Sequence, residues 1–398
     1  MSGKIANDDF LLYAFDGAPP LRPALAQLHR RAAVCHDLRL RILDDCPARY
    51  PAWVYGALEP SQFMVHDGLD WPACMAAVAD LADDQLDATT AAWRVHVFTP
   101  VTEVPSSSGP ATVAVLQLSH ALADGTRSAD LAGWLFGRAT PVKAVTAPRP
   151  GSLVLRSVTA ARAHQQLVRD TAAGVLPVPA APSPPLLTNS MPAGARTVRT
   201  LLRRRASLGD RTVTVSVLTA ISTALAGYLR DRGEEVSGLA AEVPMAYSGV
   251  RHAHNHFRNI GVALHPDLPV AGRAEVIAAQ LSAGRARSEH PAALAERRSF
   301  AAVPAPLLRW GLRHFDTSTR PPAVTGHTVV TSVYRGAADL HFGDAPVLFT
   351  AGYPALSPMM GLVHGVHGIG DAVAISVHGT ESAGDVDDYV ARLARALG

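Results

Sequence analysis

Lysine and cysteine are scarce in this sequence. Of its 36 basic residues only Lys4 and Lys143 are lysines, and the rest are arginines, which we interpret as a bias of the genome. The formal net charge of +2 lacks the basic excess that binds a polyanion, so we predict no nucleic-acid partner. The three cysteines, Cys35, Cys46 and Cys74, are odd in number and lack the spacing of zinc ligands. They argue against a disulfide scaffold and favour a reducing cytoplasm.

Long hydrophobic segments are also scarce. The first residues, Met1-Ser2-Gly3-Lys4, precede the polar run Asn7-Asp8-Asp9, so no apolar core of a signal peptide is evident and we expect a cytoplasmic protein. An uncharged stretch that could be mistaken for a membrane span runs from Thr212 to Leu229. Its threonine and serine content, and the helical spacing of Leu218 and Leu225, predict a buried helix and no membrane span.

Apolar residues are plentiful but spread along the chain. They make up 48% of 398 residues, enough to bury the cores of two domains. Residues 140–195 are rich in Pro, Ala and Ser and predict a linker, with a helix near Leu153 to Thr171. The linker separates an N-terminal half, residues 1–139, from a C-terminal half, residues 196–398. No short-period repeat is found in either half.

One alternating apolar run ends at a histidine. From Ala111 to Ser119 the side chains alternate as in a strand, with His120 directly after it. Asp124 and Gly125 interrupt this pattern as turn residues do, and the apolar residues of 131–135 then recur at helical spacing. The pattern predicts a histidine at a strand-to-helix crossing, on the edge of a domain.

A histidine in that position can act as a base. With an ordinary pKa of about 6.5, a neutral imidazole can accept a proton from a substrate hydroxyl. The alternative is that Asp124-Gly125 is only a turn and a helix cap, and that His120 is a core histidine bonded to a nearby carbonyl. The His and Asp alone do not decide between these interpretations.

The pattern His120-x-x-x-Asp124-Gly125 resembles the active-site motif of a superfamily of acyl-CoA-dependent acyltransferases. Its members include chloramphenicol acetyltransferase, the condensation domains of peptide synthetases, and the bacterial wax ester synthase/diacylglycerol acyltransferases, to which this sequence is most similar. The segments that carry the resemblance are Asn7–Leu12, Trp93–Phe98, Pro185–Asn189, Arg196–Arg205, Thr212–Glu234, Glu242–Met245, Phe257–Gly261 and Leu268–Pro269. Together they extend over nearly the whole chain.

The sequence departs from the family pattern at three places. Ser119 stands where the family usually has the first of two adjacent histidines, which leaves only His120 as the base. Arg258-Asn259 replaces a Gly-Asn pair, and Thr331–Gly336 replaces a Ser-Asn-Val-Pro-Gly-Pro stretch. The last two changes concern the acceptor side and the wall between domains, so they bear on the lipid substrate more than on the reaction.

The resemblance implies an α/β fold in which two chloramphenicol acetyltransferase-like mixed sandwich domains form a central cleft or tunnel. It implies transfer of an acyl group from acyl-CoA, the co-substrate, to the hydroxyl of a small molecule or lipid in a ternary complex. No bound cofactor and no metal is expected. Because the family acts on lipids, the resemblance also implies peripheral contact with a membrane or a lipid droplet.

The resemblance also implies roles for individual residues. His120 is the general base, and Asp124 pairs with an arginine that the sequence does not identify and holds the turn. Gly125 lets the backbone approach closely. Asn259 is the candidate oxyanion donor, because the family pattern places an asparagine there. The run Arg203–Arg205 could attract the phosphates of coenzyme A, but such a run is more often a solvated face.

Two other function classes fit the same residues. One is a condensation-type acyltransferase of specialised metabolism, which acts on a non-lipid hydroxyl or amine and can take its acyl group from a carrier protein. The other is a non-catalytic relative that binds acyl chains, suggested by Ser119, Arg258 and the altered stretch Thr331–Gly336. A polar acceptor pocket would favour the first, and an unaffected His120→Ala variant would favour the second.

Two histidine-rich segments suggest metal sites. The alternate histidines of His252–His256 resemble those of some zinc hydrolases, but Phe257 stands where a further histidine is needed, so we predict a solvated loop. His364, His367 and Asp371 could ligate a metal, but the glycines between them predict a turn joining two strands. His364 is also a candidate for lining the tunnel.

Overall fold

The computed structural model describes residues 5–147 and 151–398. The helices are α1 (Leu21–Val34), α2 (Trp71–Asp80), α3 (Gly125–Leu135), α4 (Leu153–Ala172), α5 (Val213–Arg230), α6 (Val270–Glu289), α7 (Pro291–Phe300), α8 (Ala305–His314) and α9 (Val386–Ala396). The strands are β1 (Asp8–Phe15), β2 (Leu40–Leu43), β3 (Ala52–Tyr55), β4 (Phe63–His66), β5 (Leu69–Asp70), β6 (Trp93–Thr102), β7 (Ala111–Ser119), β8 (Arg196–Arg204), β9 (Ala240–Ala246), β10 (Phe257–Ala263), β11 (Val329–Tyr334), β12 (His341–Phe342), β13 (Ala345–Tyr353), β14 (Leu362–Ile369) and β15 (Ala372–Thr380).

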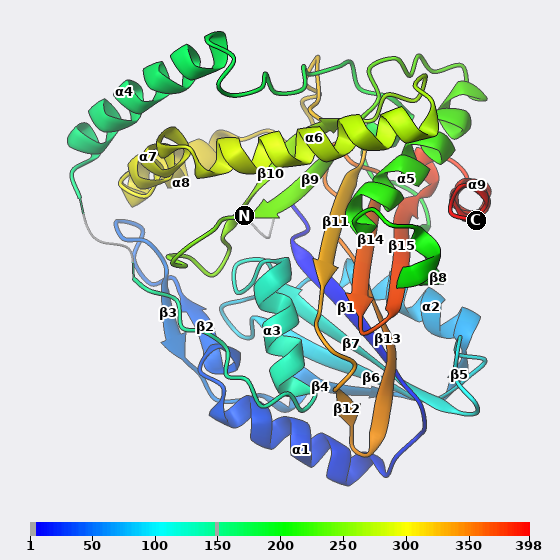
Figure 1. The fold of residues 1–398 in the computed structure, drawn as a ribbon. Coiled ribbons are helices and arrows are strands. Elements are labelled where there is room, and N and C mark those ends of the chain that lie inside the picture. Colours follow the sequence, from blue (N-terminus) through cyan, green and yellow to red (C-terminus); the bar gives the residue numbers. More distant parts are fainter. Residues whose placement is uncertain (1–4, 148–150) are drawn as a thin grey trace.

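Two large sheets organise the described residues (Figure 1). The first has the strand order β12-β13-β1-β7-β6-β4, with β5 also paired to β6, and the second has the order β10-β9-β11-β14-β15-β8. Strand β13 comes late in the chain, yet it pairs antiparallel with β1 in the first sheet. The two sheets are therefore not built from separate halves of the sequence. The domain boundaries at residues 139 and 196 stay a prediction.

The register of β1 and β7 places two polar side chains at one end of the first sheet. The predicted strand Ala111–Ser119 is β7 with the same bounds, and all nine of its residues are buried. Asp9 pairs with Leu118 across the antiparallel ladder, and the backbone N–H of His120 donates to the carbonyl oxygen of Asn7 at 2.9 Å. Because cross-strand neighbours lie on the same face, Asp9 and His120 are brought together.

Helix α5 is the buried helix that the sequence predicted. By length and composition it is, among the described residues, the one helix that could cross a membrane, but 67% of it is buried inside the protein. It packs against α6 and α9. Its apolar side chains therefore contribute to the core behind the second sheet, which also includes Val243 and Val366.

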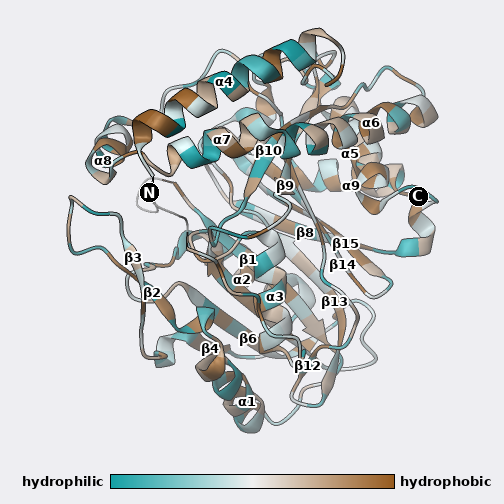
Figure 2. Cartoon of the chain, turned by 60° about the vertical axis from the view of Figure 1, so that its left-hand side comes forward, coloured by the Kyte–Doolittle hydropathy of each residue, from teal (hydrophilic) through white to brown (hydrophobic). Residues whose placement is uncertain are grey.

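The predicted linker contains a long helix on the outside of the molecule. Helix α4 nearly matches the predicted range, and none of its residues is buried. It packs along α7 (Figure 1), where Arg156 Nη1 donates to the carbonyl oxygen of Arg298 at 3.0 Å. The start of α4 has the colour of hydrophobic residues in Figure 2. Two of its apolar side chains, Val154 and Leu155, are exposed.

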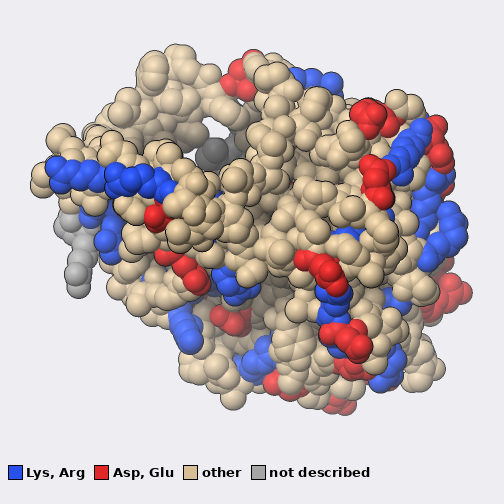
Figure 3. Space-filling view, turned by 45° about the horizontal axis from the view of Figure 1, so that its top comes forward, with Lys and Arg blue, Asp and Glu red and all other residues tan. Residues whose placement is uncertain are grey.

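The face seen in Figure 3 carries no broad field of one charge. Arginine and lysine are interspersed with aspartate and glutamate toward its edges, and the middle is mainly uncharged and hollowed (Figure 3). This distribution agrees with the small formal net charge.

Candidate active site

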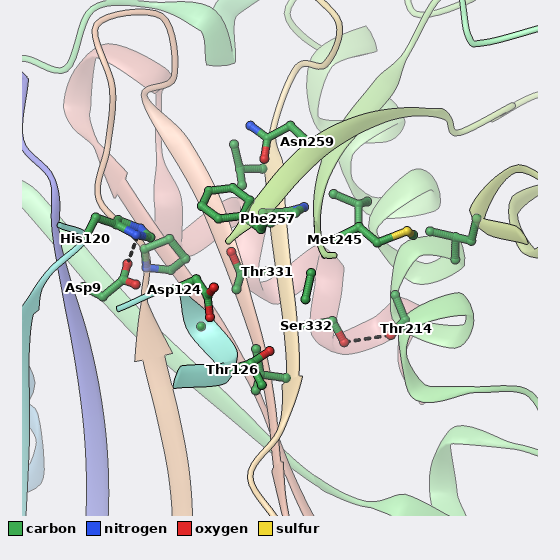
Figure 4. A pocket seen from close by; sticks show the side chains of 18 of the residues that line it. Asp9, His120, Asp124, Thr126, Thr214, Met245, Phe257, Asn259, Thr331 and Ser332 are labelled. Carbon is green, nitrogen blue, oxygen red and sulfur yellow. Dashed lines mark hydrogen bonds and ion pairs between the residues drawn. The ribbon is translucent and has the colours of Figure 1, made fainter. Parts of the chain in front are cut away.

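A cavity of about 680 Å³ lies between the two sheets. Its wall combines the starts of β1, α3 and α5 with β9, β10, β11 and the segment 354–357. His120, Asp124, Gly125 and Asn259, the four candidate site residues, all line it. The structure thus brings the sequence-predicted residues to one cavity, and Figure 4 shows how His120, Asp124 and Asn259 are arranged there.

His120 stands at the cavity wall directly after β7. Its Nε2 lies 3.2 Å from Oδ1 of Asp9, and its side chain is 28% exposed. The ring of Phe257, from β10, lies across from it with the ring centroids 6.0 Å apart (Figure 4). The imidazole therefore lies between a carboxylate from the first sheet and an aromatic ring from the second.

Asp9 changes the protonation of His120. Its negative charge raises the pKa of His120 from 6.5 to about 9, against the opposing effect of burial, and Asp124 adds a smaller contribution of the same sign. In the free protein the ring is therefore an imidazolium at neutral pH. The expectation of a neutral ring with an ordinary pKa is therefore wrong for the free protein, because the pairing of β1 with β7 places Asp9 beside Nε2, which the local sequence does not indicate.

Asp124 is held from three directions. It caps α3 by accepting from the backbone N–H of Arg127 at 3.0 Å, and it accepts from the backbone N–H of His256 at 2.8 Å. Arg251 donates to both of its carboxylate oxygens, at 2.5 and 3.1 Å. Burial alone would raise the pKa of Asp124, but these hydrogen bonds lower it below its usual value. Arg251 is the arginine that the sequence could not identify.

Gly125, the first residue of α3, lies against β11 of the second sheet. A Cβ at this position would lie 3.1 Å from Cγ2 of Val333, on β11. A side chain here would press directly on that strand, which explains why the turn uses glycine. The close approach that the resemblance implied is present.

Asn259 lines the cavity from β10, but its amide is engaged. Its Nδ2 donates to Oε2 of Glu242 at 3.0 Å, and its side chain is exposed. To act as an oxyanion donor it would have to leave Glu242. Its role in stabilising an oxyanion stays a prediction.

The histidines of the 252–256 segment have different partners. His252 contacts the carbonyl oxygen of Thr146, and His254 lies 3.7 Å from Asp37. His256 is 8% exposed and packs on the ring of Tyr247. The segment is a loop, as predicted, and His252, Ala253 and Asn255 are exposed. Its last residue, His256, is buried, and the backbone N–H of His256 supports Asp124. Within residues 5–147 and 151–398, no group of three His, Cys, Asp or Glu side chains is arranged to hold a metal ion.

His364 does not line the cavity, which corrects the expectation that it lines the tunnel. It is fully buried on the other face of the second sheet, where Thr328 and the hydroxyl of Tyr389, at 2.6 Å, are its partners. Burial lowers its pKa to about 3. A turn joins β14 to β15 at Gly370 and Asp371, as predicted, but Gly365 and Gly368 belong to strand β14. Asp371 pairs with Arg204.

Three residues of the site were not singled out from the sequence. Asp9, Phe257 and Arg251 all contact the His120-to-Asp124 turn or its ends. Asp9 and Phe257 lay within segments that resemble the family, and this was the available signal. No sequence signal pointed to Arg251, because its partner Asp124 is 127 positions away in the chain.

Neither a protein-family model nor a curated protein sequence matches this chain. Several solved structures, however, match it in fold. The wax ester synthase/diacylglycerol acyltransferase from Marinobacter aquaeolei VT8 aligns with a TM-score of 0.60 and 16% identity, over 99% of this chain and 94% of its own. The first condensation domain of the CDA synthetase aligns with a TM-score of 0.62 and 16% identity, over 98% and 90%.

A mutant starter condensation domain of rhizomide synthetase RzmA, in complex with C8-CoA, aligns with a TM-score of 0.58 and 15% identity, over 98% of this chain and 88% of that one. The chain has the same fold as these proteins. The predicted resemblance and the predicted fold class, a mixed α/β fold of the condensation-domain kind, are therefore confirmed. At these identities the likeness extends to the fold alone.

Proposed function

We propose that this protein is an acyltransferase that transfers an acyl group from a thioester to a nucleophile bound in the cavity. The observation that carries the proposal is the position of His120. Its side chain lines the cavity between the two sheets, with Nε2 beside the carboxylate of Asp9, in a fold shared with an acyltransferase and with condensation domains.

The reaction needs one proton acceptor beside the nucleophile. An acceptor hydroxyl or amine gives its proton to neutral His120 as its oxygen or nitrogen attacks the thioester carbonyl. A C–O or C–N bond forms, the C–S bond breaks, and the proton passes from His120 to the leaving thiolate. Because Nε2 of His120 faces Asp9 in the free protein, the acceptor has to open this ion pair before the ring can take the proton.

Asp124 and Gly125 support this step without reacting. The carboxylate of Asp124 is held by Arg251 and fixes the start of α3, and Gly125 lets α3 approach β11. The turn that carries His120 is therefore rigid, which a positioned base requires. We assign both residues a positioning role.

The donor we expect is acyl-CoA, with a carrier-protein thioester as the alternative. A structure of similar fold was solved in complex with C8-CoA, which supports a thioester of this kind. For the acceptor the family resemblance favours a hydroxyl, as in O-acyl transfer to a lipid alcohol or small molecule. Cytoplasmic location and peripheral contact with membranes or lipid droplets belong to the same proposal.

The test is release of free coenzyme A by the purified protein from a panel of acyl-CoAs, with and without long-chain alcohols, diacylglycerol, and small hydroxyl- or amine-bearing acceptors. His120→Ala should lower acceptor-dependent release by about 10²–10⁴-fold, as expected for loss of a general base. His164→Ala, an exposed histidine of α4, is the matched control and should keep full activity. Equal release by the His120 variant would contradict the proposal and favour a non-catalytic acyl-binding protein.

A further inference from the structure

Asp9 presents its carboxylate to the cavity, at the point where the acceptor must bind. Its side chain is 16% exposed and lines the cavity together with His120. In Figure 4 the two side chains point toward each other from β1 and from the end of β7. A nucleophile that reaches Nε2 of His120 therefore lies within contact distance of the Asp9 carboxylate.

The charged side chains near Asp9, other than His120, are engaged with other groups, so the Asp9 carboxylate can bind a ligand in the cavity. Asp124 is occupied by Arg251, and Asp8 is buried, with one carboxylate oxygen accepting from Leu86 and Gln117. The buried Arg335 interacts with Asp9 through space, but its guanidinium donates to Thr350 and to the Ala351 carbonyl oxygen. Among the described residues of the wall, the one arginine or lysine is Arg285, which lies on α6.

The part of the cavity wall around Asp9 offers several hydrogen-bond acceptors and few hydrogen-bond donors. Besides the Asp9 carboxylate and a neutral His120, Asn7 lines the cavity, and its Oδ1 is buried without a hydrogen-bond partner among the described residues. An alcohol hydroxyl brings one donor hydrogen to this part of the wall, whereas an ammonium group brings three and a positive charge. The chemistry of this part of the wall therefore fits a cation.

We propose that the acceptor substrate carries a primary ammonium group, and that Asp9 binds it in place of the imidazolium of His120. This inference rests on the proposed acyl transfer and names its substrate class. The ammonium is either the nucleophile itself or stands beside a nucleophilic hydroxyl, as in an amino alcohol. Once it pairs with Asp9, its charge repels a second cation, so His120 becomes neutral and able to accept a proton.

The proton balance needs one acceptor in the site besides solvent. An ammonium that becomes an amide nitrogen loses two protons, while a C–N bond forms and the C–S bond breaks. The bound ammonium releases the first proton to solvent, and the resulting neutral amine attacks the thioester carbonyl. His120 takes the second and delivers it to the thiolate, which leaves as a thiol. When the hydroxyl of an amino alcohol reacts instead, His120 alone transfers a proton and the ammonium stays on Asp9.

The experiment compares hexylamine, 2-amino-1-hexanol and 1-hexanol as acceptors with the acyl-CoA that gives the most release. Coenzyme A release gives kcat/KM, and mass spectrometry distinguishes amides from esters. We expect kcat/KM for each of the two amines to exceed kcat/KM for 1-hexanol by at least about tenfold, which is the effect expected of one charge-assisted hydrogen bond. Asp9→Asn should lower this amine-to-alcohol ratio by about tenfold to a hundredfold, mainly through KM. Asp45→Asn, at an exposed aspartate, should leave the ratio unchanged.

A binding measurement separates this inference from the proposed function. Hexylammonium is titrated calorimetrically into His120→Ala protein and into the double variant with Asp9→Asn, and the double variant should bind about tenfold or more weakly. If 1-hexanol is acylated as well as the amines and Asp9→Asn leaves the ratio unchanged, the ammonium site is overturned while acyl transfer stands. If no acceptor causes release, acyl transfer from acyl-CoA is overturned, and Asp9-independent binding would overturn the ammonium site as well.

Discussion

Arg251 donates to both carboxylate oxygens of Asp124, and this pair joins two segments 127 positions apart in the chain. Asp124 caps the helix that follows the His120 turn, whereas Arg251 belongs to the loop between β9 and β10. The contact therefore connects the end of the first sheet to the second sheet at the cavity. It makes the orientation of His120 depend on the packing of both sheets.

Removing the arginine should be costly for stability. In Arg251→Ala the carboxylate of Asp124, which is 3% exposed, would stay buried without its countercharge, at a cost of about 3–5 kcal/mol. Urea unfolding measures this free energy. The double variant with Asp124→Asn should recover part of the loss, because the unpaired charge is gone. Equal stability of Arg251→Ala and the parent would contradict the interpretation of Asp124 as a buried, arginine-dependent anchor.

Activity toward alcohols should rise with pH. The imidazolium of His120 must lose its proton to act as a base, and Asp9 raises its pKa to about 9. For an acceptor without a charge, kcat/KM should therefore increase up to about pH 9, and Asp9→Asn should move the midpoint down toward the ordinary value of 6.5. A pH profile of coenzyme A release checks this, and identical midpoints in the two proteins would show that Asp9 does not control the base.

The same ion pair contributes to stability over a defined pH range. Because the pKa of His120 is higher in the folded than in the unfolded protein, its contribution is fully present below pH 6.5 and is lost as the pH rises through about 9. Thermal unfolding of the parent and of His120→Ala across this range measures the difference. The difference in unfolding temperature between the two proteins should become smaller as the pH rises. A difference that grows with pH would contradict the upward direction of the pKa shift of His120.

Gly125→Ala should introduce a steric conflict. The new methyl group would lie 3.1 Å from Cγ2 of Val333, and over-packing of this kind costs about 1–3 kcal/mol. It should also displace the His120 turn and lower kcat. Adding Val333→Ala should restore both the free energy of unfolding and the activity in part. Failure of the second substitution to restore either would place the conflict elsewhere.

His364→Leu should affect stability without changing the reaction. The buried hydroxyl of Tyr389 would lose its partner, at about 1–3 kcal/mol for an unsatisfied group, whereas Thr328 keeps the Leu362 carbonyl oxygen as its acceptor. Because His364 lies outside the cavity wall, KM for donor and acceptor should match the parent at a temperature where both proteins are folded. A changed KM would contradict this placement.

Local patterns in the sequence predicted several elements with nearly correct bounds. The strand Ala111–Ser119 is β7, and the predicted helices near 153–171 and 212–229 are α4 and α5. In each of these elements the side chains repeat with the period of one strand or one helix. Periodicity depends only on neighbours in the chain, so it can be read without a structure.

The sequence by itself determined the strand, the turn and the helix that carry His120, Asp124 and Gly125, because turn chemistry and apolar spacing are local properties. Only the tertiary structure decided what faces them. The pairing of β1 with β7 brought Asp9 to His120, and a distant loop supplied Arg251. Strand β13 joined the first sheet from the far end of the chain. These contacts join segments many residues apart, and the electrostatics of the site follow from their distances, which no local pattern encodes.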